Sequence, residues 1–380
     1  MKGRLTSMLI ALLLLALLFG VGACAFFKHP KFGKTPHGAR MEAILQSPHY
    51  IDGAFRNLIE TPKFTQGASI FSIMRHDLLN PVARLTPERP IPVIKTDLKA
   101  LAAYEDLVIW LGHSSYFIQL AGQRILLDPI LSDHAAPLDF FNKAFAGTTL
   151  YTADELPAID YLLISHEHWD HLDYPTVKAL QHKVSRVITP LGVGSYFELW
   201  GYDSTIIFEG DWEAQFAFDD GLTIHLLPAR HYSNRLLQQN QTLWAGFALE
   251  SSTRRLFFSG DSGYGPHFAE IGRRFGSFDF VALDSGQYDP RWAYIHMTPG
   301  EALSAARDLK AAALLPSHVG RFSISRHPWD EPLIQIASLS HGVNPRLLTP
   351  RIGEPVKLAA QQQTFSPWWV EMNPPPTLLD

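Results

Sequence analysis

Short apolar or alternating runs separated by turn residues begin near residue 107 and continue through most of the remaining chain. Runs of this length bounded by turn residues predict strands. Stretches of helical character lie between them, at Thr176–His182, Gly194–Trp200 and Pro299–Leu309. Strands interleaved with helices predict a layered α/β domain with helices outside two sheets. The predicted strands are Val108–Leu111, Phe117–Leu120, Arg124–Leu127, Tyr161–Ile164, Val187–Thr189, Thr205–Phe208, Phe216–Phe218, Thr223–Leu227, Trp244–Leu249, Leu256–Ser259, Phe280–Leu283 and Ala312–Leu315.

The chain before residue 107 has a different composition and fewer regular runs. Residues 28–106 are rich in turns, proline and aromatic side chains, with only short helical patches such as Gly38–Gln46. This composition is typical of an extension that packs on a core. The pattern therefore predicts three parts: an N-terminal segment at 1–27, an extension at 28–106 and the main domain at 107–380.

The N-terminal segment contains an uncharged run, Met8–Phe27, preceded by Lys2 and Arg4. Three interpretations compete: a retained transmembrane anchor, a lipoprotein-type signal acylated at Cys24, and a cleaved secretory signal. The length of the run favours the anchor, because about 20 apolar residues span a bilayer core. The positive-inside rule keeps the N-terminus of an anchor cytoplasmic, and all three interpretations place the body on the periplasmic or extracytoplasmic side.

Composition narrows the classes of function. The chain is 46% hydrophobic and 18% charged, which is typical of a globular protein. Its net charge of −5, without a polybasic run, argues against a nucleic-acid partner. A single cysteine excludes an internal disulfide and a cysteine-based zinc site. Because there are 17 histidines, we expect any metal to be bound by imidazole and carboxylate.

The motif that carries chemistry follows the predicted strand Tyr161–Ile164 and has the form H-x-H-x-D-H. As the chain turns at the strand end, His166 and His168 are expected to point into one pocket, and Asp170 and His171 into a neighbouring one. Each half-site then needs further ligands from elsewhere in the chain. Nitrogen and oxygen ligands without thiolate suit zinc, and also manganese or iron.

Three other positions, each shortly after a predicted strand, are candidates for the missing ligands. They are His231, Asp261 and His318. Glycines on both sides of Asp261, at 260 and 263, are expected to let the backbone approach an ion closely. A ligand after a strand at four separate places predicts a single site at one edge of the sheet assembly.

These motifs together resemble the metallo-β-lactamase superfamily of αβ/βα sandwich hydrolases. The match is closer to the branch of N-acylphosphatidylethanolamine-hydrolysing phospholipase D and its bacterial RomA-like relatives. The resemblance implies a four-layer αβ/βα sandwich and covers roughly residues 107–342. It is carried by Ser47–Asn57, Trp110–Ser115, Leu127–Ile130, His166–Asp173, Phe258–Tyr264 and Tyr288–Trp292.

The resemblance also implies a site with two zinc ions and a metal-activated water that hydrolyses a phosphodiester. Asp170, Asp261 and His296 are the implied catalytic residues. Trp169 and His296 are implied to hold the substrate, a phospholipid or another amphiphilic small molecule. The implied ligands are His166, His168 and His231 for one ion, Asp170, His171 and His318 for the other, and Asp261 as a bridge between them.

Two departures from this family leave the substrate open. Trp169 stands where tyrosine is usual, and Asp284 stands where the lipase branch tends to be apolar or to have proline. The alternatives are a zinc hydrolase of a lactone, a β-lactam or another phosphodiester, and a non-catalytic membrane-bound scaffold. Filled ligand positions argue against the scaffold.

Two further polar residues follow predicted strands. His113 is expected to be structural rather than catalytic. Asp128 is expected to fix a loop or to orient a ligand histidine from outside the metal site.

Overall fold

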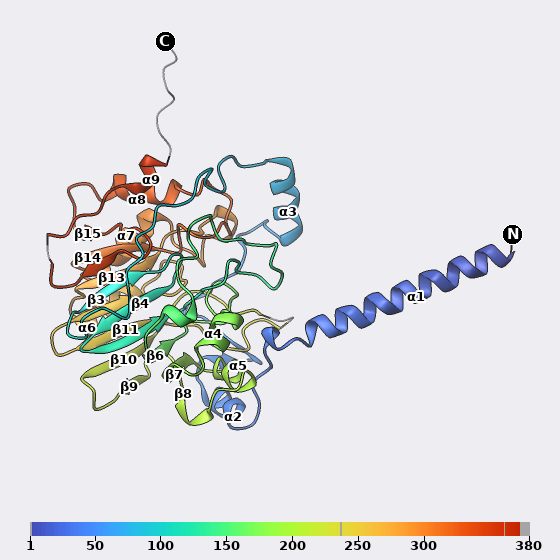
Figure 1. Ribbon diagram of the computed structural model, residues 1–380, viewed down its shortest axis with the longest axis horizontal. Coiled ribbons are helices and arrows are strands. Elements are labelled where there is room, and N and C mark those ends of the chain that lie inside the picture. Colours follow the sequence, from blue (N-terminus) through green and yellow to red (C-terminus); the bar gives the residue numbers. More distant parts are fainter. Residues whose placement is uncertain (1, 236–237, 361, 373–380) are drawn as a thin grey trace, which may run out of the picture.

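Two seven-stranded sheets form the centre of the protein in the computed structural model, which describes residues 2–235, 238–360 and 362–372 (Figure 1). The first sheet has the order β16-β3-β4-β5-β6-β7-β8 and changes from antiparallel to parallel pairing at β5. Its strands are β3 (Leu107–Trp110), β4 (Tyr116–Leu120), β5 (Gln123–Leu127), β6 (Ile159–Leu163), β7 (Val184–Pro190), β8 (Ile207–Gly210) and β16 (Pro355–Lys357).

The second sheet has the order β15-β14-β13-β12-β11-β10-β9 and makes the same change from antiparallel to parallel pairing at β12. The sheets are therefore mixed, because some of their strands are joined by hairpins and others by helical crossovers. Its strands are β9 (Gln215–Ala217), β10 (Leu222–Leu227), β11 (Gly246–Ser251), β12 (Arg255–Phe258), β13 (Phe280–Asp284), β14 (Ala313–Ser317) and β15 (Arg346–Leu347).

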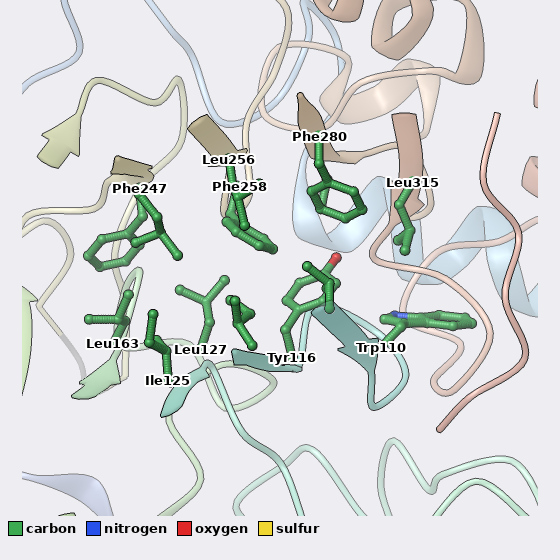
Figure 2. Packing of buried hydrophobic residues seen from close by; sticks show 14 of the residues in the cluster. Trp110, Tyr116, Ile125, Leu127, Leu163, Phe247, Leu256, Phe258, Phe280 and Leu315 are labelled. Atoms are coloured by element: carbon green, nitrogen blue, oxygen red, sulfur yellow. The ribbon is translucent and has the colours of Figure 1, made fainter. Parts of the chain in front are cut away.

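The main core lies between the sheets. Figure 2 shows side chains of the first sheet, such as Tyr116 and Leu127, facing side chains of the second, such as Phe258 and Phe280. The rings of Tyr116 and Phe258 lie 5.0 Å apart, centre to centre. Because alternate residues of each strand point inward, this layer removes one face of both sheets from water.

Helices cover the two outer faces and complete four layers. Residues of α4 (Tyr174–Leu180) and α5 (Gly194–Leu199) share an apolar cluster with the first sheet. Residues of α6 (His267–Phe275), α7 (Pro299–Asp308) and α8 (Glu331–Leu339) share another with the second. A last short helix is α9 (Trp368–Glu371), and 3-10 turns lie at Pro30–Phe32, Ala153–Glu155, Ser204–Ile206 and Pro290–Trp292.

The segment at residues 28–106 contains the helices α2 (Ala39–Gln46) and α3 (Ile70–Leu79). A two-stranded hairpin, β1 (Tyr50–Ile51) and β2 (Ala54–Phe55), lies between them. Ile44 and Phe55 of this segment belong to the main apolar core. The segment is therefore packed on the two-sheet body, while the boundaries predicted at residues 27 and 106 stay predictions.

The prediction of an N-terminal membrane anchor is wrong. The helix α1 (Lys2–Phe27) covers the apolar run. Over the residues that the structure describes, no helix combines the length and the apolar character that a bilayer crossing requires. The predicted location, with the protein held in a membrane by this segment, is corrected by the same finding.

Candidate metal centre

Histidine and aspartate side chains converge at one edge of the two sheets, beyond the ends of their strands. His166, His168, Asp170 and His171 lie in the loop between β6 and α4. The other three come from the second sheet: His231 follows β10, Asp261 follows β12 and His318 follows β14. The structure brings the four strand ends together: all seven residues belong to two adjoining groups that could each hold a metal ion.

The first group consists of His166, His168, His231 and Asp261. His168 Nδ1 lies 2.9 Å from His166 Nε2 and 3.2 Å from His231 Nε2. Oδ2 of Asp261 lies 3.7 Å from His166 Nε2 and 3.6 Å from His231 Nε2. Three imidazole nitrogens and one carboxylate oxygen thus face a common point.

The second group consists of Asp170, His171 and His318, joined by His113. Oδ2 of Asp170 lies 3.6 Å from His171 Nε2 and 3.7 Å from His318 Nε2. Oδ1 of Asp261 also faces this group, at 3.0 Å from His171 Nε2 and 2.7 Å from His318 Nδ1. Asp261 therefore presents one oxygen to each group, which is the geometry of a bridging carboxylate.

Partners outside the two groups fix which nitrogen of three histidines faces inward. His171 Nδ1 lies 2.7 Å from Asp128 Oδ2, and His231 Nδ1 lies 3.0 Å from the carbonyl oxygen of Ile295. Because both partners are acceptors, each Nδ1 donates a proton to its partner, and each Nε2 is the nitrogen that faces the group. His166 Nδ1 similarly lies 2.9 Å from Ser165 Oγ. This is the arrangement by which metal-binding histidines are oriented, and Asp128 has the orienting position expected from the sequence.

The protonation of the first group also fits a cation. Burial lowers the pKa of His168 to about 3, and burial together with His171 holds the pKa of His166 well below its usual value. These rings are therefore neutral, as ligands must be. Neutral imidazole nitrogens that converge on one point are the form in which histidine binds a metal ion.

The second group also fits a cation, in this case because of its carboxylates. Burial lowers the pKa of His171, but the carboxylates of Asp261 and Asp170 outweigh it and raise the pKa well above the usual value. His171 Nε2 and Asp261 Oδ1 are both buried and lie 3.0 Å apart, yet within the described part of the chain neither makes a hydrogen bond of good geometry. A cation between them would satisfy the carboxylates in place of a proton, so the residues fit a metal ion.

His296 lies beside both groups, between β13 and α7. Its ring centre is 5.1 Å from that of His231 and 5.1 Å from that of His318. Its Nδ1 donates to Oδ2 of Asp284 at 2.7 Å, and its pKa is raised because this carboxylate outweighs the effect of burial. The Asp284 carboxylate therefore leaves Nε2 of His296 available for another partner.

Sequence reasoning missed this role of Asp284 and treated the residue only as a departure from the resembling family. Asp284 is the last residue of the buried strand β13 and is fully buried. The signal was present, because the other candidate residues also follow buried strands. What the sequence does not contain is the contact itself, which joins the last residue of β13 to His296, near the start of α7.

Trp169 is half-buried and faces other aromatic and basic groups. Its ring makes an edge contact with Phe32, with 5.3 Å between ring centres. The guanidinium carbon of Arg235 lies 3.9 Å from its ring centre, at cation–π distance. Trp169 thus joins the metal-site loop to the segment around residue 32, and its predicted contact with substrate stays a prediction.

The chain is similar to known proteins over most of its length. The sequence model of the family described as the beta-lactamase superfamily domain matches residues 123–319. An uncharacterized protein of Mycobacterium tuberculosis is 36% identical over 328 residues, which cover 85% of this chain and 88% of the relative. The outer membrane protein RomA of Klebsiella pneumoniae is 55% identical over 102 residues, covering 27% of this chain and 77% of RomA.

A third relative is N-acyl-phosphatidylethanolamine-hydrolyzing phospholipase D 1 of Caenorhabditis elegans, which is 31% identical over 230 residues, or 56% of this chain and 63% of that protein. Among solved structures, an isothiocyanate hydrolase from Delia radicum gut bacteria has a TM-score of 0.53 at 21% identity, over 66% of this chain and 98% of that one. This last likeness shows the fold alone. The chain therefore belongs to the metallo-β-lactamase superfamily and has, at one edge of its sheets, the paired His and Asp groups of a metal-dependent hydrolase.

Proposed function

We propose that this protein is a dinuclear hydrolase of phosphodiester bonds, of the phospholipase D type, acting on phospholipids similar to N-acylphosphatidylethanolamine. The observation that carries the proposal is the position of Asp261, which presents one carboxylate oxygen to each of the two groups. The likeness to the phospholipase D of Caenorhabditis elegans supports the choice of substrate. We further propose zinc as the metal, because imidazole and carboxylate ligands suit it.

When bound, a metal pair supplies a water nucleophile at neutral pH and neutralises charge on the group that is transferred. The chain's own residues then have separate tasks. Asp128 and the Ile295 carbonyl hold His171 and His231 in the tautomer that a metal needs. His296 is placed to donate a hydrogen bond to a phosphate oxygen or to the leaving oxygen.

His296 suits that task because of its two contacts. Asp284 holds its Nδ1 and favours the protonated ring. The candidate ligand atoms of Asp261, His296 and His318 all lie within 4.8 Å of one another, so the ring lies beside the place where the two groups meet. A protonated donor next to a substrate anion stabilises the charge that develops during hydrolysis.

A panel of substrates tests the proposal. The metal-loaded protein is assayed with N-acylphosphatidylethanolamine, bis(p-nitrophenyl) phosphate, a lactone and a β-lactam. We expect hydrolysis of both phosphodiesters, with the lipid preferred, and only slow turnover of the other two. Preference for the lactone or the β-lactam would assign the centre to another bond, and inactivity towards all four in a protein that holds metal would contradict the proposal.

A further inference from the structure

His113 is built into the metal centre at the contact between the two sheets. It follows β3 of the first sheet, is fully buried, and has a left-handed backbone with φ of 55°. Its backbone N–H donates to the carbonyl of Val319 at 3.0 Å, and its own carbonyl accepts from the N–H of His318 at 3.1 Å. The backbone of His113 is thus tied to that of a candidate ligand from the second sheet.

The side chain of His113 also contacts two members of the second group. Its Nε2 lies 2.8 Å from Asp170 Oδ2, and its ring centre lies 4.0 Å from that of His318. The opposite nitrogen, Nδ1, is buried and has no hydrogen-bond partner among the described residues. Among the residues that the structure describes, the ring's one hydrogen bond is therefore directed at the carboxylate of Asp170.

The contact with Asp170 fixes where a proton of the ring lies, because Nε2 is 2.8 Å from the carboxylate oxygen. An imidazole donates through an N–H, and a carboxylate accepts only. Nε2 of His113 therefore carries the proton and donates it to Oδ2 of Asp170. A hydrogen bond of this kind limits the rotation of the carboxylate that it holds.

We infer that His113 is a positioning residue for the second metal position and that it sets the affinity of that position separately from the first. The inference rests on the metal centre proposed above. We infer separate affinities because His113 contacts one group and not the other. It contacts Asp170 and His318 of the second group, whereas the described contacts of His113 include none of this kind with the first group. Removing an outer hydrogen-bond partner of a metal ligand typically costs about 10- to 100-fold in metal affinity.

Two substitutions distinguish the effect of the hydrogen bond on metal affinity from the effect of the ring's volume. His113→Phe keeps the ring but removes the donor, and His113→Gln restores an N–H at about the reach of Nε2. Metal content and stepwise affinities are measured by chelator competition, with Co²⁺ absorption as a report on each position. We expect His113→Phe to bind the second ion about 10- to 100-fold more weakly, with the first unchanged, and His113→Gln to recover most of the loss.

His225→Phe is the matched control. His225 is also buried and lies near a carboxylate, with its Nε2 3.4 Å from Glu250, but it belongs to neither group. The control variant should keep both affinities. If His113→Phe does not fold, His113→Asn replaces it, because asparagine tolerates the left-handed backbone and its amide is too short to reach Asp170.

The outcomes are distinct. Wild-type affinities at both positions in folded His113→Phe would overturn the inference. Equal loss of the second ion in the Phe and Gln variants would also overturn it, since that result makes His113 a direct ligand. If the wild-type protein itself fails to bind two ions, the failure belongs to the proposed function and not to His113.

Discussion

At the scale of single residues, glycines allow the loops that contain the candidate ligands to pack closely against other backbone segments. A Cβ on Gly286 would lie 1.9 Å from the carbonyl oxygen of His318, and one on Gly263 would lie 2.0 Å from that of Tyr294. The sequence suggested that Gly260 and Gly263 let the backbone approach an ion. The structure shows them facing other backbone segments instead, because a Cβ on Gly260 would meet the carbonyl of Ala245 at 2.9 Å.

Gly263→Ala tests this packing. The added methyl group would push away the backbone at Tyr294 and with it the Ile295 carbonyl, which accepts from His231 at 3.0 Å. We expect a loss of about 1–3 kcal/mol in the free energy of unfolding, as for other overpacked sites, and weaker metal binding at the first group. Urea unfolding and chelator competition measure the two effects.

Gly300→Ala is the control, because only a side-chain methyl of Leu339, at 3.8 Å, lies near its added atom. Gly300 lies in α7, where alanine is preferred to glycine, so this variant should be slightly more stable. Equal stability and metal affinity in both variants would show that the close approach at Gly263 is unimportant.

A substitution of His296 tests the substrate contact proposed for it. His296→Ala should keep both metal ions and lose about 10- to 1,000-fold in the rate of phosphodiester hydrolysis, the usual effect of removing an oriented polar donor. A neutral lactone should be affected much less. Metal analysis and the two rates decide the matter: wild-type phosphodiesterase rates with full metal content would leave His296 with a structural role only.

His267 should make the protein sensitive to mild acid. Burial, assisted by Arg230, lowers its pKa to about 3, whereas an unfolded histidine titrates near 6.5. Below pH 6.5 the unfolded state therefore binds more protons, and stability falls with the pH. The linkage relation gives a loss of about 2 kcal/mol between pH 6.5 and pH 5 from this residue alone.

The measurement compares wild type with His267→Gln, both as purified, by urea unfolding at pH 7 and pH 5. Glutamine cannot be protonated, and its side-chain amide can still donate a hydrogen bond to Ser262, whose Oγ lies 3.3 Å from the histidine Nε2 and itself donates to the carbonyl of Gly263. The difference in stability between the two pH values should shrink in the variant. An unchanged difference would mean that His267 does not remain neutral in the folded protein.

At the scale of elements, the period of the apolar residues predicted the central strands to within a few positions. The helix α6 was not predicted, although Phe268, Ile271 and Phe275 follow helical spacing and are buried. Charged residues between these positions interrupt the apolar run, so the helical spacing was not recognised. The edge strands β15 and β16 have two and three residues, so their pairing with β14 and β3 defines them rather than any local preference.

The start of α7 has a stability role that can be tested. Thr298 caps the helix, accepting from the N–H of Glu301 while Glu301 accepts from the N–H of Thr298. We expect Thr298→Ala to cost about 1 kcal/mol in unfolding free energy. Ser69→Ala removes a similar cap from α3, which buries only Ile73, and should cost less. Equal losses in urea unfolding would argue against this account of α7.

At the scale of the whole molecule, the centre exists only because two sheets meet. Four of the seven candidate ligands lie on the loop after β6 of the first sheet, and His231, Asp261 and His318 come from the second. The sequence could predict this meeting because a ligand after a strand is a local signal. It could not predict the contact of His113 with Asp170, which lies 57 residues away in the sequence, or the contact of Asp284 with His296, which depends on the path of the loop after β13.

The segment before residue 107 contributes to the same edge. Asn57 donates to the carbonyl of His231 at 2.7 Å and accepts from its N–H at 3.1 Å. An extension was expected from the composition, but this contact was not, since it spans 174 residues. The N-terminal run shows the reverse case: its apolar composition predicted an anchor, and the described helices do not supply one.

The most direct test of the account is the metal content of the purified protein and of its Asp261→Ala variant. Because Asp261 presents one oxygen to each group, its removal should weaken both positions together. Elemental analysis should find two transition-metal ions per wild-type chain, and fewer than one in a variant that remains folded by circular dichroism. Two ions in Asp261→Ala, or none in the wild type after loading, would contradict the dinuclear centre.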